Sequence, residues 1–197
     1  SGVSTMWRSS PSPTRNLAST SFGSTTPSEL PIWRTLSVSG RLAAFGDAES
    51  ALEAAQPGLL YPDLLAEVQR RIGMRFEAPA TEDEASAFGA SVKDWPAFAD
   101  STAALAELKR HYKLAILSNV ERASFAHSAR KLGVEFDLVV TAQDVGSYKP
   151  NLAHFHVGLE KLKAMGVPKD KVLHVAQSLF HDHVPAKQVG LPSVWIN

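Results

Sequence analysis

His111-Tyr-Lys-Leu-Ala-Ile-Leu-Ser-Asn-Val120 is the stretch of sequence that decides the fold. Its centre, Leu114 to Leu117, is an unbroken apolar run, which is typical of a strand buried on both faces of a parallel sheet. Small polar side chains follow directly, at Ser118 and Asn119. Because ligands of open α/β sheets bind outside the carboxyl ends of the strands, these two residues form a candidate site. Asn119 also suits the N-cap of a helix over residues 121–132, with Gly133 just past its end as the stop, and a helix cap alone is the alternative interpretation.

Length and composition exclude several classes of protein. A chain of 197 residues fits one domain, or one core with an insertion, and a hydrophobic share of 44% is that of a globular protein. The formal net charge is zero, so nothing favours nucleic acid or an anionic membrane as a partner. The absence of cysteine excludes disulfides, thiolate metal sites and cysteine nucleophiles, and it suits a cytoplasmic location. A homodimer and a monomer both remain open.

Residues 1–42 differ in composition from the rest of the chain. Serine, threonine and proline dominate, and Glu29 is the only acidic residue. Since such a segment cannot bury enough apolar surface to fold, we expect it to be poorly ordered. Arginines among the serines also resemble an organellar transit peptide. The abrupt change near Leu42 further favours the hypothesis that a reading-frame or splice-model error replaced the original N-terminal segment.

Helical patterns begin after residue 42, and we assign residues 43–97 to a helical subdomain. Thr81 followed by Glu84 has the spacing of a capping box at a helix start. Trp95 is expected to be a packing anchor near the end of this subdomain.

Residues 98–197 alternate between helices and short apolar runs. Asp100 is expected to cap the first helix, and Pro150 is expected to stand in the first turn of a later one. Strands alternating with helices of this length predict right-handed βαβ units, hence an α/β fold with a parallel sheet covered on both faces. The helices and strands predicted in this part are 101–110, 114–117, 121–132, 136–140, 150–165, 171–175, a short helix that ends at Gly190, and 193–196.

Polar residues follow three of these strands. Ser118 and Asn119 end the first, and Lys149 stands after the second, immediately before a helix. Ser178 and Asp182 follow the third. Because the carboxyl ends of parallel strands meet at one edge of a sheet, we expect Ser118, Lys149 and Asp182 to lie at one rim, facing the helical subdomain.

The order Leu117-Ser-Asn, then Ser147-Tyr-Lys-Pro150, then Ser178-x-x-x-Asp182 resembles the haloacid dehalogenase superfamily, and most closely its type II 2-haloacid dehalogenase branch. The resemblance implies a three-layer α/β/α Rossmann-like core with an inserted helical cap. It implies that Ser118 and Asn119 bind the anionic group of the substrate and that the Lys149 ammonium offsets negative charge at the nucleophile. Ser178 and Asp182 would position Lys149 and the nucleophile.

The resemblance also implies an activity, the hydrolysis of carbon–halogen bonds in small (S)-2-haloacids without a cofactor. In that family an aspartate attacks the substrate, and water hydrolyses the resulting ester. Phosphatase members bind Mg²⁺ through several carboxylate oxygens. Here Gln177 stands where a phosphatase typically has an aspartate, which favours metal-free chemistry over the alternative of a Mg²⁺-dependent phosphate-ester hydrolase. A non-catalytic remnant of the fold is a third interpretation.

Two departures from the family pattern oppose activity. Phe155 stands where the dehalogenase branch usually has a tyrosine. The first motif, a strand end with the nucleophilic aspartate, should precede the cap, yet residues 1–42 contain no aspartate. We therefore expect the chain as written to be inactive.

The sequence does not favour a metal site or a serine hydrolase site. His174, His181 and His183 are interpreted as polar residues near a helix terminus and not as metal ligands, because residues two apart in a helix point in nearly opposite directions. Ser118 lacks the Gly-x-Ser-x-Gly surroundings of a serine hydrolase.

Overall fold

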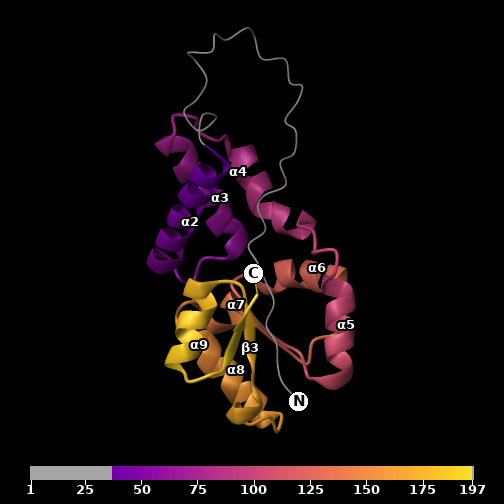
Figure 1. The fold of residues 1–197 in the computed structure, drawn as a ribbon. Coiled ribbons are helices and arrows are strands. Elements are labelled where there is room, and N and C mark those ends of the chain that lie inside the picture. Colours follow the sequence, from indigo (N-terminus) through magenta and orange to yellow (C-terminus); the bar gives the residue numbers. More distant parts are fainter. Residues whose placement is uncertain (1–36, 197) are drawn as a thin grey trace. The chain divides into compact units, whose positions relative to one another are not determined.

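The computed structural model describes residues 37–196, and these fall into two compact units, 37–95 and 96–196 (Figure 1). The first unit is helical and the second combines helices with parallel strands. The boundary between them follows Trp95, whose buried ring meets the Tyr61 ring edge-on and whose indole N–H donates to Ser91 Oγ.

The helical unit consists of α2 (Val38–Ala55), α3 (Tyr61–Arg75), α4 (Glu82–Gly89) and the short 3-10 helix η2 (Ala90–Asp94). Apolar side chains spaced three and four residues apart on α3 face the other helices, as in an amphipathic helix. The fully enclosed members of this small core are Leu52, Leu64, Leu65, Val68, Ala85 and Val92.

The start of α2 differs from the sequence prediction. The helix begins at Val38, so residues 38–42 are helical although we assigned them to the poorly ordered N-terminal segment. The Ser37 hydroxyl caps this helix by accepting from the Gly40 N–H at 3.1 Å. No apolar stripe reveals the helix in the sequence, because α2 buries two glutamates, Glu49 and Glu53, together with Leu52. Residues 1–36, which hold most of the segment predicted to be poorly ordered, lie outside the described residues.

Helix α4 starts and packs as local chemistry dictates. The Thr81 hydroxyl accepts from the Glu84 N–H, and the Glu84 carboxylate accepts from the Thr81 N–H at 2.9 Å, which confirms the predicted capping box. At its other end, α4 approaches α3 so closely that a β-carbon on Gly89 would stand 2.2 Å from the Pro62 carbonyl oxygen. Glycine is therefore required at this contact.

The core unit has its elements in the order shown in Figure 1. The elements are α5 (Ser101–His111), β1 (Ala115–Ser118), α6 (Arg122–Leu132), β2 (Leu138–Thr141), α7 (Ala142–Val145), α8 (Ala153–Ala164), η3 (Lys169–Lys171), β3 (His174–Ala176), η4 (Leu179–His183), α9 (Val184–Gln188) and β4 (Ser193–Trp195). The strands lie between helices in sequence, as predicted, and the short helix predicted after the third strand is formed by η4 and α9. The short helices before α8 and before β3, α7 and η3, were not predicted.

The strands form two parallel pairs. Strand β1 pairs with β2, from Ala115 opposite Leu138 to Ser118 opposite Thr141. Strand β3 pairs with β4, with His174 opposite Ser193. Within residues 37–196 no ladder of hydrogen bonds joins the two pairs, whereas we predicted a single sheet. The first motif, which the sequence lacks, was expected within residues 1–42, most of which lie outside this range.

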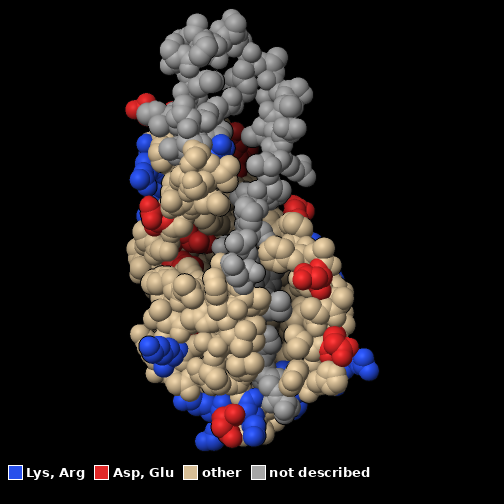
Figure 2. All heavy atoms as spheres, in the orientation of Figure 1, with Lys and Arg blue, Asp and Glu red and all other residues tan. Residues whose placement is uncertain are grey.

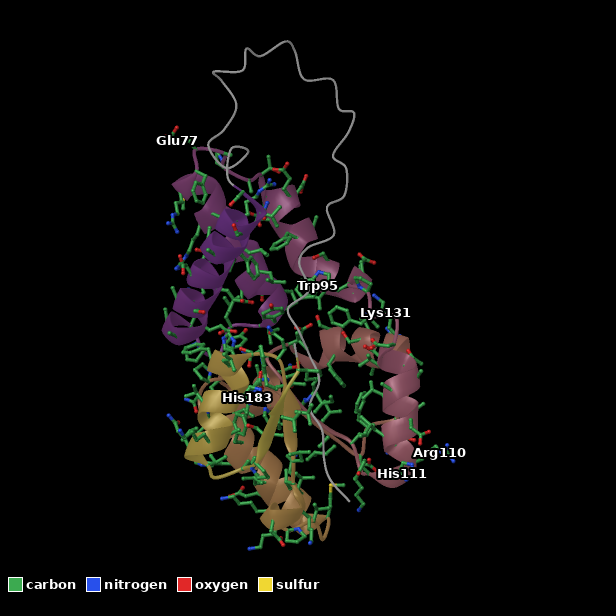
Figure 3. All side chains as sticks on the ribbon, viewed as in Figure 1. Glu77, Trp95, Arg110, His111, Lys131 and His183 are labelled. Carbon is green, nitrogen blue, oxygen red and sulfur yellow. The ribbon has the colours of Figure 1, made fainter. Side chains whose placement is uncertain are left out.

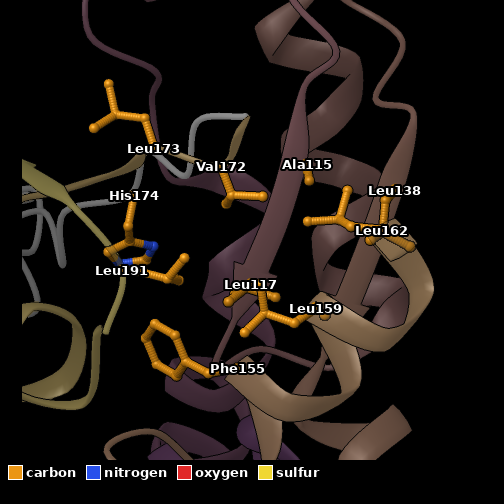
Figure 4. Close-up of a pocket in the computed structure, with 11 residues that line it drawn as sticks. Ala115, Leu117, Leu138, Phe155, Leu159, Leu162, Val172, Leu173, His174 and Leu191 are labelled. Carbon is orange, nitrogen blue, oxygen red and sulfur yellow. The ribbon is translucent and has the colours of Figure 1, made fainter. Parts of the chain in front are cut away.

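A small apolar cavity of about 20 Å³ lies among residues of β1, α8 and the segment that enters β3 (Figure 4). Leu117 and Phe155 are among its lining residues, and Gly158 of α8 allows close packing, since a β-carbon there would stand 2.8 Å from a Leu117 methyl group. The lining is therefore well packed and leaves room for no more than about one water molecule.

Helices cover the strands on both sides, and two apolar clusters show this. Leu114 packs with Leu105 of α5 and Leu132 of α6. The next residue, Ala115, belongs to a second cluster with Phe155 and Leu162 of α8. Successive side chains of a strand point to opposite faces, so the unit has the predicted α/β/α layers.

Three details of the predicted helix starts are wrong. Asp100 precedes α5, but its side chain makes no capping hydrogen bond. Asn119 does not cap α6; Glu121 does, by accepting from the Ser124 N–H at 2.9 Å, because the Asn119 side chain is engaged elsewhere. Pro150 lies in a turn before α8, which begins only at Ala153. The predicted stop of the Glu121 helix is confirmed, since Gly133 has the left-handed conformation with φ of 70°.

Charged side chains on the helix surfaces pair locally. At the C-terminal end of α5, Arg110 and His111 both contact Glu107, at 3.0 Å each (Figure 3). None of the helices in the described part of the chain combines the length and the apolar character that crossing a bilayer requires.

Candidate active site

Lys149 is a buried cation at the carboxyl ends of the strands. Its side chain is only 9% exposed, and its Nζ donates to Asp182 Oδ1 at 2.7 Å and to the Leu117 carbonyl oxygen at 2.9 Å. The ammonium thus joins the end of β1 to the helix that follows β3. A lysine is almost never buried to this degree unless it is paired, so these two contacts fix the position of the charge.

Asp182 is the anionic partner in this pair. Burial opposes the ionisation of its carboxyl group, but the charge of Lys149 and hydrogen bonds from His174 and Lys149 outweigh burial and lower the pKa of Asp182 well below its usual range. His174 Nε2 lies 3.3 Å from the same oxygen that Lys149 contacts. Because the carboxylate is an acceptor only, His174 is the donor in this contact.

Burial holds His174 in its neutral form. It lowers the pKa of His174, and this effect exceeds the opposing hydrogen bond and charge of Asp182. The Phe155 ring packs against the imidazole, with ring centroids 5.1 Å apart. The buried pair of Lys149 and Asp182 therefore gains a hydrogen-bond donor without gaining a second positive charge. Figure 2 shows exposed charged side chains scattered over one face of the core unit, in contrast to this enclosed pair.

Asn119 ties the end of β1 to the main chain of Lys149. Its Oδ1 accepts from the Lys149 N–H at 2.8 Å, and its Nδ2 donates to the Lys149 carbonyl oxygen at 3.2 Å. The amide side chain therefore supplies both a donor and an acceptor, which an aspartate in its place would not. This double contact explains why Asn119 does not cap α6.

Ser118, the last residue of β1, is buried, and both its hydroxyl and its carbonyl oxygen make hydrogen bonds. Its hydroxyl oxygen accepts from the Val120 N–H at 3.3 Å, and its carbonyl oxygen lies 3.3 Å from His154 Nε2. His154 is fully enclosed in α8. Burial, followed by the positive charge of Lys149, lowers the pKa of His154 to about 4. The histidine therefore donates to Ser118 as a neutral group.

Ser178 acts on the helix that carries Asp182. Its hydroxyl oxygen caps η4 by accepting from the His181 N–H at 3.1 Å, and the same hydroxyl lies 3.1 Å from His181 Nδ1. The Ser178 carbonyl oxygen accepts from the Asp182 N–H at 3.2 Å. Its contact with Asp182 is thus through the backbone. His183, labelled in Figure 3, donates from Nε2 to the Ala176 carbonyl oxygen at 2.9 Å.

The carboxylates nearest to the ends of β1, β2 and β3 all take part in a cap or an ion pair, although Glu121 does so through Oε1 alone and its buried Oε2 has no hydrogen-bond partner within residues 37–196. Glu121 caps α6, and Asp182 pairs with Lys149. Asp144 accepts from the N–H and hydroxyl of Thr141 and pairs with Arg122. Although burial opposes ionisation of Asp144, the hydrogen bonds from Thr141 and Arg122 and the charge of Arg122 lower its pKa. Each carboxylate therefore already serves a cap or an ion pair.

A divalent cation does not fit the side chains gathered here. Mg²⁺ prefers carboxylate oxygens in an octahedral arrangement. Gln177 at the end of β3 is neutral, and Asp182 is committed to the Lys149 ammonium, which would repel a cation. Within residues 37–196 no group of three acidic, histidine or cysteine side chains is arranged to hold a metal ion.

Most of the residues that meet here were predicted from the sequence as site candidates. Asn119, Lys149 and Asp182 come together through direct contacts. Ser118 directly precedes Asn119 in the chain, and Ser178 contacts Asp182 through its carbonyl oxygen. His154 was not predicted, and His174 was predicted to be a polar residue without a role in the site. A histidine on the otherwise apolar face of the Phe155 helix was the available signal for His154, but its contact with Ser118 depends on how α8 packs on β1.

Comparison with known proteins identifies a matching family and two proteins similar in sequence. A family model described as haloacid dehalogenase-like hydrolase matches residues 65–196. The haloacid dehalogenase-like hydrolase domain-containing protein 3 of Xenopus laevis is 34% identical over 87 residues, which are 43% of this chain and 34% of that protein. The glyceraldehyde 3-phosphate phosphatase of Methanothermobacter thermautotrophicus is 30% identical over 103 residues, 51% of this chain and 44% of the phosphatase.

The fold also matches a solved dehalogenase. The L-2-haloacid dehalogenase from Xanthobacter autotrophicus superposes with a TM-score of 0.68 at 18% identity, covering 84% of this chain and 69% of that one. The chain spans less than half the length of the two curated relatives, so their activities are not transferred directly. Since the family model matches more than half of the chain, including every strand described above, the chain belongs to the haloacid dehalogenase-like hydrolase family.

Proposed function

We propose that the core unit serves the hydrolysis of carbon–halogen bonds in small 2-haloacids. Ser118 and Asn119, at the end of β1, would bind the carboxylate of the substrate, and the Lys149 ammonium would stand beside the reacting group. The observation that carries the proposal is the buried Lys149, held 2.7 Å from Asp182 and 2.9 Å from the end of β1. A preorganised ammonium in an enclosed site is suited to stabilise negative charge that develops on a nucleophile or an ester.

The same geometry supports metal-free chemistry and no cofactor. A displacement at carbon releases a halide ion, and its charge changes require only a fixed cation beside the nucleophile. Lys149 supplies that cation, while Gln177 and the committed Asp182 do not suit Mg²⁺.

We further propose that the 197-residue chain binds such a substrate but does not turn it over. The displacement needs a carboxylate nucleophile, and the carboxylates after β1, β2 and β3 are engaged in caps and ion pairs. Losing the principal nucleophile commonly costs several powers of ten in rate. The chain would then act as an anion-binding remnant of the enzyme fold.

The test combines binding with turnover. The purified chain is titrated with 2-chloropropionate while the Asn119 side-chain amide is followed by NMR, and halide release is measured in parallel. We expect saturable binding that Lys149→Met abolishes, and no halide release. Absence of binding would refute the proposed function, and halide release abolished by Lys149→Ala would refute the proposed inactivity.

A second candidate is a phosphate-ester hydrolase of the same fold. It is favoured by one observation, the 30% identity to a glyceraldehyde 3-phosphate phosphatase. Turnover of an aryl phosphate, measured with and without Mg²⁺, separates the two candidates. Strong Mg²⁺-dependent phosphate release would establish the second and reject the first.

A further inference from the structure

His154 stands out among the residues around the candidate site. It lies in the first turn of α8, is completely buried, and directs Nε2 to the Ser118 carbonyl oxygen at 3.3 Å. A carbonyl oxygen only accepts, so the imidazole carries its proton on Nε2 and is oriented by the end of β1.

The other ring nitrogen is left unsatisfied. His154 Nδ1 is buried and has no hydrogen-bond partner among residues 37–196. An unpaired buried acceptor costs free energy, which a leucine at this position would avoid. Gly158, four residues further on and therefore on the same side of α8, packs against Leu117, so this side of the helix faces the apolar core. A histidine at this position can donate a hydrogen bond to the Ser118 carbonyl oxygen, whereas an apolar side chain cannot.

That contact reaches the site through one turn of main chain. The Ser118 carbonyl belongs to the peptide group that ends in Asn119, and the Asn119 side chain holds both the N–H and the carbonyl oxygen of Lys149. Lys149 Nζ in turn holds the preceding carbonyl oxygen, that of Leu117. Two consecutive carbonyl groups at the end of β1 are thus each fixed by a side chain from residues 149–154.

We propose that His154 is a positioning residue of the anion site, holding the Ser118 carbonyl so that the Ser118–Asn119 turn and Lys149 keep the orientation that receives the substrate. The inference rests on the proposed function, which assigns the carboxylate of the substrate to this turn. A neutral imidazole suits the task, because it orients the backbone without adding a second cation beside Lys149.

The test compares two substitutions at His154 with one at His156, an exposed histidine on the same helix. Glutamine retains an N–H donor, and leucine removes it. For 2-chloropropionate we expect His154→Leu to weaken binding about tenfold, the size of one lost hydrogen bond. His154→Gln should remain within about threefold of the wild-type dissociation constant, and His156→Leu should leave it unchanged. Equal affinity of wild type and His154→Leu would overturn the proposal.

Two further measurements stand apart from substrate binding. Hydrogen exchange of the Lys149 amide, which bonds Asn119, should be about tenfold faster in His154→Leu than in wild type, and rescued by glutamine. If the wild-type chain binds no 2-chloropropionate, the proposed function fails, and this exchange alone decides the role of His154. If the leucine variant does not fold, ¹⁵N spectra of the wild type decide: a proton on Nε2 and none on Nδ1 at pH 7 supports the proposal, and any other state overturns it.

Discussion

Lys149 Nζ and Asp182 Oδ1 lie 2.7 Å apart, and both side chains are enclosed by the core unit. The charges come from segments 33 residues apart, so only folding brings them together. Each ion lacks its hydration shell and depends on the other for compensation. The pair is therefore a structural requirement as well as the centre of the candidate site.

Replacing Lys149 by methionine should destabilise the core unit by roughly 3–5 kcal/mol, because Asp182 would remain buried without its cation. The free energy of unfolding in urea measures this. Lys163→Met, at an exposed position of α8, is the matched control and should change stability by less than about 0.5 kcal/mol. In the double variant Lys149→Met/Asp182→Leu much of the loss should be recovered. A double variant no more stable than Lys149→Met would contradict this account of the pair.

Stability should fall as the pH decreases from 7 to 4. The unfolded chain protonates His154 near pH 6.5, whereas the folded protein does so only near pH 4, so the unfolded state binds more protons between these values. The depressed pKa of His174 acts in the same direction. The pKa of Asp182 is lowered from its ordinary value of 3.8, so below about that pH the unfolded chain also binds a proton at Asp182 that the folded protein does not. Stability therefore continues to fall there. At the low end of this range the His154 contribution amounts to roughly 3 kcal/mol.

Urea unfolding at pH 7, 6 and 5 checks this dependence. His154→Gln removes one titrating group, so its stability should depend less steeply on pH, by up to about 1.4 kcal/mol per pH unit. His156→Gln, at an exposed position of the same helix, serves as the control for the substitution itself. Parallel curves for wild type and His154→Gln would show that His154 titrates normally in the folded protein.

Gly89→Ala should destabilise the helical unit by about 1–3 kcal/mol or more, since its β-carbon would collide with backbone. The colliding atom, the Pro62 carbonyl oxygen, cannot move away as a flexible side chain would. Gly58→Ala is the control, because nothing lies within 4 Å of a β-carbon at that position. Thermal unfolding followed by circular dichroism compares the two, and equal midpoints would mean that α3 and α4 do not approach as described.

Gln177→Asp should not by itself create a Mg²⁺ site, because Asp182 stays paired with the Lys149 ammonium, which would repel a cation. The substitution adds a carboxylate at the end of β3, in the same segment as Asp182. A ligand that binds only the folded state raises the unfolding temperature, so the midpoint with and without Mg²⁺ measures any binding. Gln188→Asp, at an exposed position of α9, controls for added charge. A Mg²⁺-induced shift in Gln177→Asp that Gln188→Asp does not show would contradict this expectation, and a shift already present in wild type would favour the phosphatase candidate.

The sequence by itself determined the order of elements in the core unit. Continuous apolar runs predicted the strands around Leu117 and Val140 to within a few residues, because strands buried on both faces carry no polar alternation. The capping box at Thr81 and the stop at Gly133 were predicted correctly, since both depend on residues close together in the chain. The same locality let the polar residues after each strand be named as site candidates.

Only the tertiary structure decided which partners those residues take. Asn119 has the chemistry of a helix cap, but Lys149 offers it two hydrogen bonds across the strand ends, and Glu121 caps α6 instead. In the sequence, His154 is only a polar residue on an otherwise apolar helix face. Its contact with the Ser118 carbonyl oxygen exists because α8 packs on β1. The energies of such contacts depend on burial and on groups distant in sequence, and neither is encoded in local spacing.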